Sequence, residues 1–166
     1  KFNQSYLEYL KNEVDKLEVE YDEDFDIPSG VTEDAFNKAR AERDGFINYD
    51  KELTSLDRKY RVEKMDLYKD DNLFFVKIGT PQKLSYVIDQ AKTTVRILQN
   101  RESVIEIDDI EVNVQGICLW LILNRKEKVE KLSDTNSIIF HMKLIEWKKV
   151  AMDAGYQPRV LINYVI

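Results

Sequence analysis

The chain has 166 residues, of which 43% are hydrophobic and 11% aromatic, and its net charge is −6. This length and apolar content exclude a wholly disordered chain and are typical of a domain with its own core. No apolar run reaches the roughly 20 residues that span a bilayer, and the lone cysteine, Cys118, excludes a disulfide within the chain. We therefore expect a cytoplasmic protein with no membrane partner.

The negative charge is concentrated in the first third of the chain. Residues 1–50 contain 6 basic and 14 acidic side chains, whereas the remainder contains 19 basic and 17 acidic ones. An acidic segment repels phosphate backbones, and a nearly balanced segment can still bind them locally. The charge pattern argues against unspecific nucleic-acid binding and permits a focused site.

The N-terminal segment is predicted to be a helix followed by an acidic loop. Residues 4–19 carry apolar side chains near helical spacing, and residues 20–26 form an acidic run typical of a solvated loop. Pro28-Ser29-Gly30 then breaks the chain. We therefore separate an N-terminal acidic helix and loop, residues 1–31, from an α/β domain, residues 32–166. Because the sequence opens on Lys1 rather than Met, we expect a piece of a longer protein or a processed form.

The middle of the chain predicts a helix, three strands and a second helix. The first helix should begin after Thr32, with two carboxylates in its first turn, and end near Gly45. A short strand at 46–49, a half-buried strand around 62–68 and a continuously apolar strand at 73–78 follow, with a polar turn at 69–72. The next helix, with Pro81 in its first turn, has one apolar stripe: Leu84, Val87, Ile88, Ala91, Val95 and Leu98.

The last third of the chain adds further strands and one helix. Residues 101–115 alternate like two short strands, and residues 116–123 form an apolar strand buried on both faces. Residues 137–153 have helical spacing, with Gly155 as the stop, and residues 159–166 form a closing strand. This order predicts a central mixed sheet flanked by helices.

Several chemistries have no residues to support them. The sequence lacks a glycine-rich phosphate loop, a dinucleotide fingerprint and paired metal-binding cysteines. The single histidine, His141, excludes a histidine-clustered metal site, and we expect it to pack or cap within the last helix. Cys118 should be inert in its apolar strand, and Trp120 and Trp147 should belong to the core.

One group of polar residues could form an active site. Asp66 lies on one predicted strand, Lys77 at the end of the next, and Gln90 on the following helix. The order resembles the PD-(D/E)XK pattern of restriction-endonuclease-like nucleases, in which an acid precedes acid-x-lysine and RecB-like members add a glutamine. Phe75 occupies the place of the second acid, and phenylalanine cannot bind a cation. A plain salt bridge between Asp66 and Lys77, with Gln90 exposed, is the structural alternative.

A metal-dependent reading assigns each of these residues a role. Asp66 and Glu63 would hold Mg²⁺ through carboxylate oxygens, with Asp57 as a further substitute for the missing acid. Lys77 would offset the charge on a phosphate, and Gln90 would position the backbone or a water molecule. The catalytic candidates are thus Asp66, Lys77 and Gln90, and the metal candidates are Asp66 and Glu63.

Several short segments of the chain together match a known pattern: residues 35–39 and 48–51, Val62-Glu63-Lys64-Met65-Asp66-Leu67, Phe74-Phe75-Val76-Lys77, residues 84–91, residues 139–143, residues 154–156 and the closing strand. Through these segments the chain resembles the C-terminal part of large, sporadically distributed bacterial proteins of unknown function that are associated with mobile elements and suspected of a defence role. Phe75 and Tyr86 replace two histidines of that pattern, and Ala91 replaces a glycine. The resemblance implies a missing N-terminal portion and a bacterial cytoplasmic setting.

Two functions follow as expectations. The first is a nucleic-acid-binding, Mg²⁺-dependent nuclease-like domain of a defence or mobile-element protein, acting on DNA or RNA. The second is a non-catalytic module on the same fold that binds a protein partner or the remainder of a larger chain. The position of Phe75 discriminates between them, since a buried Phe75 beside Asp66 without a polar pocket favours the second.

Overall fold

The computed structural model describes residues 3–48, 55–57, 60–61, 66–99, 104–107 and 110–166. The helices are α1 (Gln4–Asp15), η1 (Glu23–Phe25), α2 (Glu33–Arg43), α3 (Pro81–Gln99), η2 (Leu132–Thr135) and α4 (Ile138–Asp153), where η marks a 3₁₀ helix. The strands are β1 (Val19–Glu20), β2 (Ile47–Asn48), β3 (Ser55–Asp57), β4 (Tyr60–Arg61), β5 (Leu67–Lys69), β6 (Asn72–Gly79), β7 (Val104–Ile107), β8 (Ile110–Asn113), β9 (Gly116–Leu123) and β10 (Gln157–Tyr164).

Six strands form one mixed sheet in the order β1-β10-β9-β6-β5-β2. The strands β1, β10, β9 and β6 are parallel, whereas β5 and β2 are antiparallel to their neighbours. The pairs β3–β4 and β7–β8 are separate two-stranded sheets. The described part of the chain therefore confirms the predicted mixed α/β fold.

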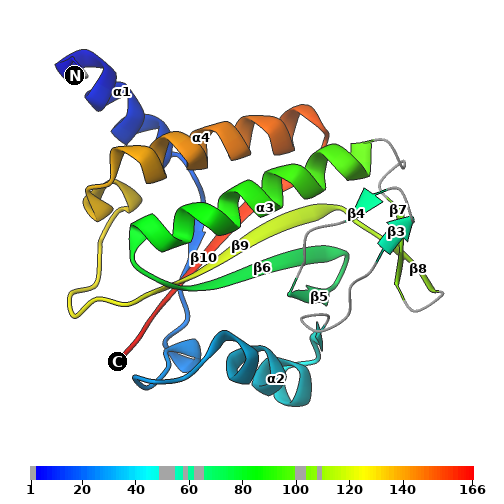
Figure 1. Cartoon of the computed structure of the whole chain (residues 1–166). Coiled ribbons are helices and arrows are strands. Elements are labelled where there is room, and N and C mark those ends of the chain that lie inside the picture. The colour runs from blue at the N-terminus through cyan, green and yellow to red at the C-terminus, as the bar shows by residue number, and fades with distance from the viewer. Residues whose placement is uncertain (1–2, 49–54, 58–59, 62–65, 100–103, 108–109) are drawn as a thin grey trace.

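Helices cover both faces of this sheet. Figure 1 shows α3 and α4 side by side over one face and α2 against the other. The flanks of α3 and α4 are joined by an ion pair of 2.7 Å between Lys92 and Glu146 and by a pair between Asp89 and Lys143. Parallel strands need a crossover connection, and the crossover from β6 to β9 includes α3, which covers one face of the sheet. Both strands lie in the middle of the sheet.

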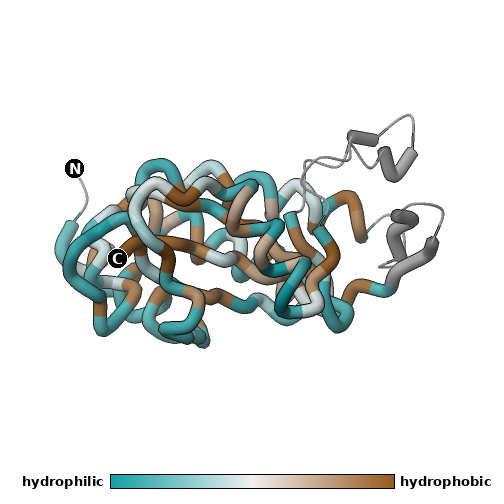
Figure 2. The backbone as a smooth tube through the Cα atoms, turned by 90° about the horizontal axis from the view of Figure 1, so that it is seen from below, coloured by the Kyte–Doolittle hydropathy of each residue, from teal (hydrophilic) through white to brown (hydrophobic). Residues whose placement is uncertain are grey.

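The alternation of side chains along β6 and β9 divides the core into two clusters. Phe75 and Leu119 point toward α3 and α4, whereas Phe74 and Trp120 point toward α2. The predicted apolar stripe of α3 is buried in the first cluster, and all of β9 is buried. In Figure 2 many hydrophobic stretches of the backbone lie in the middle of the molecule, and many hydrophilic stretches lie in the turns at its periphery.

The hairpin between β5 and β6 confirms the predicted polar turn. Asp70 and Asp71 have φ values of +50° and +64°, the left-handed region that two-residue hairpin turns use. The next strand begins beside this turn, where Asn72 approaches Gly116 so closely that an added Cβ would lie 2.0 Å from the Asn72 side-chain oxygen. Glycine at this position lets β9 start next to β6.

The N-terminal segment differs from its prediction. The expected helix over 4–19 ends at Asp15, and Val19–Glu20 instead pairs in parallel with β10. The acidic run is not a solvated loop throughout, because the Asp26 side chain is only 5% exposed. Leu17 explains the early end: it is buried in the core cluster that lies under α4, so the chain leaves the helix and passes along the sheet edge.

The packing residues behave as predicted. His141 is buried, with its Nε2 atom 2.8 Å from the Thr135 hydroxyl, and burial lowers the pKa of its ring. Cys118 is fully buried, and that burial raises the pKa of its thiol far above the usual range. Trp120 and Trp147 are both inaccessible to solvent. Among the helices that the structure describes, none has the length and apolarity to cross a bilayer.

Candidate functional site at the open edge of β6

Among the described residues, no strand pairs with the second half of β6 on one of its edges. The strand β5 pairs only with residues 72–74, so the amide groups of Val76 and Ile78 on that edge need other acceptors. The carboxylate of Asp66 accepts from the Val76 amide at 2.7 Å, and that of Glu33 accepts from the Ile78 amide at 3.1 Å. Two carboxylates therefore stand where a strand would otherwise pair, and we call this group the β6-edge site.

The predicted lysine lies at the same edge. The ammonium nitrogen of Lys77 is 3.3 Å from the Glu33 carboxylate, and both side chains are 34% exposed. Asp66 binds the amide of the residue directly before Lys77. The structure thus brings Asp66 and Lys77 to one stretch of β6, and the ion pair that it records for Lys77 is with Glu33 of α2.

The other predicted site residues are Gln90, Glu63 and Asp57. Gln90 lies half-buried in the middle of α3, on the flank opposite Asp89 and Lys92, which face α4. The contacts recorded for the β6-edge site do not include its side chain among the described residues. Glu63 lies outside the described residues, as does the Asp57 side chain, so their roles as metal ligands stay predictions.

Phe75 occupies the core rather than the site. It pairs with Leu119 in the sheet and is fully buried in the apolar cluster beneath α3. Within the part of the chain that the structure describes, no three or more His, Cys, Asp or Glu side chains gather closely enough to hold a metal ion. Any metal bound at the β6 edge therefore needs a ligand of another residue type or one from the segments outside the description.

A buried amide on α2 has no hydrogen-bond partner among the described residues. Asn37 is inaccessible to solvent, and neither its side-chain nitrogen nor its oxygen is bonded. Leaving such a group unpaired costs about 1–3 kcal/mol, so an orphaned buried amide calls for an explanation. Asn37 lies four residues after Glu33, hence on the same helix face.

The sequence pattern does not single out Glu33 or Asn37. Glu33 fits the general preference for carboxylates in a first helical turn, which gives no reason to assign it to a site. A signal was nevertheless present: a polar stripe recurs at helical spacing beside Phe36 and consists of Glu33, Asn37, Arg40 and Asp44. A polar stripe beside the buried face of a short helix indicates a polar environment beneath it.

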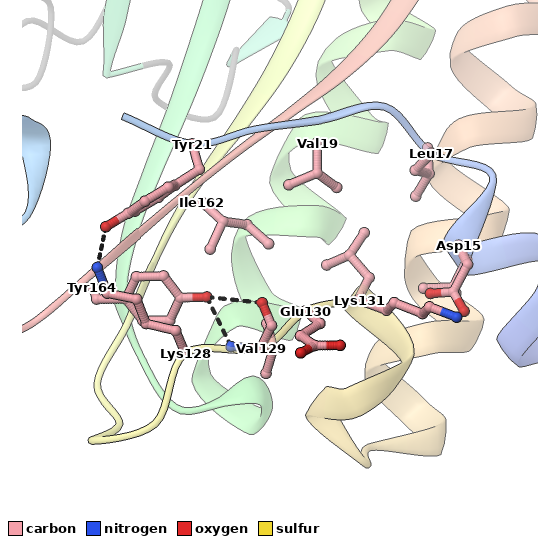
Figure 3. Close-up of a pocket in the computed structure, with 12 residues that line it drawn as sticks. Asp15, Leu17, Val19, Tyr21, Lys128, Val129, Glu130, Lys131, Ile162 and Tyr164 are labelled. Carbon is pink, nitrogen blue, oxygen red and sulfur yellow. Dashed lines mark hydrogen bonds between the residues drawn. The ribbon is translucent and has the colours of Figure 1, made fainter. Parts of the chain in front are cut away.

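A separate pocket lies at the carboxyl ends of the parallel strands (Figure 3). Its volume is about 510 Å³, and we call it the strand-end pocket. The Lys128 ammonium lies 4.6 Å from the centre of the Tyr21 ring and 5.4 Å from that of Tyr164, and the Tyr164 hydroxyl accepts from the Val129 amide at 3.0 Å. The lining residues are Val14, Asp15, Leu17, Val19, Tyr21, Lys128, Val129, Glu130, Lys131, Leu132, Ile162 and Tyr164.

Asp26 anchors the wall of this pocket. One of its oxygens accepts from the Tyr164 amide at 2.8 Å and from the Asn163 side chain at 3.3 Å, and the other accepts from the Tyr21 hydroxyl at 2.8 Å and from Lys128 at 3.3 Å. Burial alone would raise the pKa of Asp26, but these hydrogen bonds outweigh it and hold the pKa below its usual value. The carboxylate is therefore structural.

The fold and the two sites define a mixed α/β domain with a polar strand edge and a tyrosine-lined pocket. The chain belongs to a family of unknown function (DUF6119), whose model matches residues 1–138. The matched region contains both sides of the β6-edge site, while most of α4 and all of β10 lie beyond it. No curated protein and no solved structure matches the chain.

Proposed function

We propose that this domain binds DNA or RNA and hydrolyses phosphodiester bonds at the β6-edge site with the help of Mg²⁺, as part of a cytoplasmic bacterial protein of a mobile element or defence system. One observation carries the proposal. Asp66 and Glu33 bind successive outward amides of β6, and Lys77 stands between those amides in the sequence. Two acids and a lysine at one strand edge are the residue types that metal-assisted phosphodiester cleavage uses.

The donor set at this edge suits Mg²⁺. Mg²⁺ takes oxygen ligands and is commonly held by one or two carboxylates together with substrate phosphates and water. Asp66 and Glu33 supply two carboxylates, each already oriented by a backbone amide. Bound here, Mg²⁺ would supply charge to stabilise the phosphate in the transition state.

The remaining residues act on the nucleic-acid backbone. Lys77 is partly exposed, so its ammonium can turn from Glu33 to a phosphate oxygen and offset the charge that develops there. Gln90, on the flank of α3 that faces away from α4, would contact the backbone on the other side of the sheet edge. The acidic residues beside β10, among them Glu20 and Asp26, would repel phosphate and restrict binding to the β6 edge.

Cleavage of labelled DNA and RNA by the purified chain with Mg²⁺ or Mn²⁺ tests the proposal. Lys77→Ala should abolish cleavage while circular dichroism shows an intact fold. Lys92→Ala is the matched control, because Lys92 forms its ion pair with Glu146 between α3 and α4, and it should cleave at the parental rate. Cleavage by Lys77→Ala at the parental rate would remove the assignment.

A second function is favoured by the burial of Phe75. With the acid position filled by a core side chain and Lys77 paired to Glu33, the same fold would serve as a non-catalytic module that binds a partner. The strand-end pocket of about 510 Å³ offers such a module a binding cavity. This function predicts no divalent-cation binding in calorimetry and no cleavage by any variant, whereas the nuclease function predicts both.

A further inference from the structure

We propose that Asn37 is the third ligand of the β6-edge site, so that its side-chain oxygen joins the carboxylates of Asp66 and Glu33 in binding a hard divalent cation. The inference rests on the proposed function for the location of the site. In this assignment α2 supplies the ligand oxygen that Phe75, a core side chain, cannot supply.

The course of α2 along β6 places Asn37 level with Asp66. Glu33, at the start of α2, binds the amide of Ile78, while the carbonyl of Asp44, at the end, accepts from Lys69 at 2.6 Å. Since Lys69 pairs with the first residue of β6, the helix runs antiparallel to that strand. Four residues advance a helix by about 6 Å, and two residues advance a strand by about 6.6 Å. Asn37, one helical turn beyond Glu33, therefore lies level with Val76, whose amide donates to Asp66.

The rotation of α2 directs Asn37 to the strand edge. Phe36 packs edge-on against Trp120 of β9, with ring centres 5.0 Å apart, and so faces the middle of the sheet. Successive helical residues differ by about 100° around the axis. Asn37 is turned away from Trp120 and shares the face of Glu33, which reaches β6 at its open edge.

An unpaired buried amide has both an acceptor and a donor group available to a ligand. Both polar atoms of Asn37 are buried without partners. Hard divalent cations accept side-chain amide oxygens together with carboxylates. The nitrogen of the same amide can donate to a phosphate or water oxygen bound to the cation. One buried amide then satisfies both of its groups only when the site is filled.

Calorimetric titration of the full chain with Mn²⁺ tests this assignment. The wild type should bind one ion, and Asn37→Leu, which keeps the size of the side chain, should weaken binding at least about tenfold, the loss typical of removing a group that supports a metal site. Asn37→Asp keeps the oxygen and adds charge, so it should bind at least as tightly as the wild type. Asp34→Asn is the charge control, because Asp34 is in the same first turns of α2 and pairs with Lys38 at 3.2 Å; it should leave affinity unchanged.

Thermal unfolding in EDTA separates a ligand from a structural amide. Removing two unpaired buried atoms should raise the midpoint of Asn37→Leu by about 2–4 °C. A lower midpoint together with unchanged Mn²⁺ affinity would overturn the inference, as would the absence of Mn²⁺ binding by the wild type. Mn²⁺ binding that depends on Asn37 without any cleavage of nucleic acid would uphold the ligand and refute the nuclease. Cleavage by Asn37→Leu at the parental rate would uphold the nuclease and refute Asn37 as a ligand.

Discussion

The long parallel strands have β10 on one side and β6 on the other, and at both edges a carboxylate accepts a backbone amide. The two edges differ in how many of the neighbouring polar groups are hydrogen-bonded. At each edge the amide lies beyond the strand pairing of the described residues: Asp26 binds the Tyr164 amide, and Asp66 binds the Val76 amide. Asp26 is 5% exposed and receives four hydrogen bonds, so every group around it is paired. The β6 edge combines the partly exposed Glu33 with the unpaired Asn37.

This difference separates a structural network from a candidate site. A fully satisfied buried polar network rigidifies a fold, whereas a partly satisfied one costs stability and persists only where another requirement maintains it. The β10 edge therefore holds the sheet together. The β6 edge has unused binding capacity, which is why we place the proposed chemistry there rather than beside Asp26.

The largest expected effect is at the complete edge. Asp26→Ala would leave the Tyr164 amide without its acceptor and remove one of the two acceptors of the Asn163 side chain, so the free energy of unfolding should fall by about 3 kcal/mol. Urea unfolding followed by tryptophan fluorescence measures this loss. A decrease below about 0.5 kcal/mol, the size of an ordinary surface change, would show that the β10 edge is not the structural one.

The corresponding change at the β6 edge should cost less. Asp66→Ala removes the acceptor of the Val76 amide, and we expect a loss of about 2 kcal/mol. Asp66→Asn keeps an acceptor oxygen and should recover most of that stability while still removing the charge that a cation requires. If Asp66→Asn is as unstable as Asp66→Ala, the charge of Asp66 is structural, and the contrast between the two edges disappears.

Acid should affect the β10 edge through Asp26. Its pKa lies below the ordinary value of 3.8, so the unfolded chain takes up this proton first as the pH falls. The stabilisation by Asp26 is therefore complete above pH 3.8 and is lost below it, by at most about 1.4 kcal/mol per pH unit. Urea unfolding of the wild type and Asp26→Asn between pH 5 and pH 2.5 measures this slope, which should be shallower in the variant.

The contrast between the edges also explains what the sequence could predict. Periodicity is a property of neighbouring residues, so the α3 stripe, the buried strand β9 and the two-residue turn at Asp70-Asp71 were all accessible from local patterns. Asp66 and Lys77 were accessible as candidates because Asp66 directly precedes β5 and Lys77 lies in the next strand, β6. Their surroundings were not, because Glu33 meets Ile78 across 45 positions and Asp26 meets Tyr164 across 138.

The N-terminal error has the same origin. Val19–Glu20 continues an amphipathic pattern and reads locally as helix, yet it pairs with β10, a strand formed by the last residues of the chain. Tertiary pairing overrides local propensity at such a position. Likewise, the acidic run at residues 20–26 has the composition of a solvated loop, yet its Asp26 side chain is only 5% exposed and binds the closing strand β10.

The smallest expected effect decides whether Lys77 is available for a phosphate. A double-mutant cycle with Lys77→Ala and Glu33→Gln measures the coupling of their ion pair, and Glu33→Gln retains an acceptor for the Ile78 amide. For a pair this exposed the coupling should be about 0.5 kcal/mol and should shrink in high salt. A lysine held so weakly can exchange one anionic partner for another when nucleic acid arrives. A coupling above about 2 kcal/mol, typical of a desolvated pair, would instead make Lys77 a structural residue like Asp26 and leave the β6 edge without a free cation for phosphate.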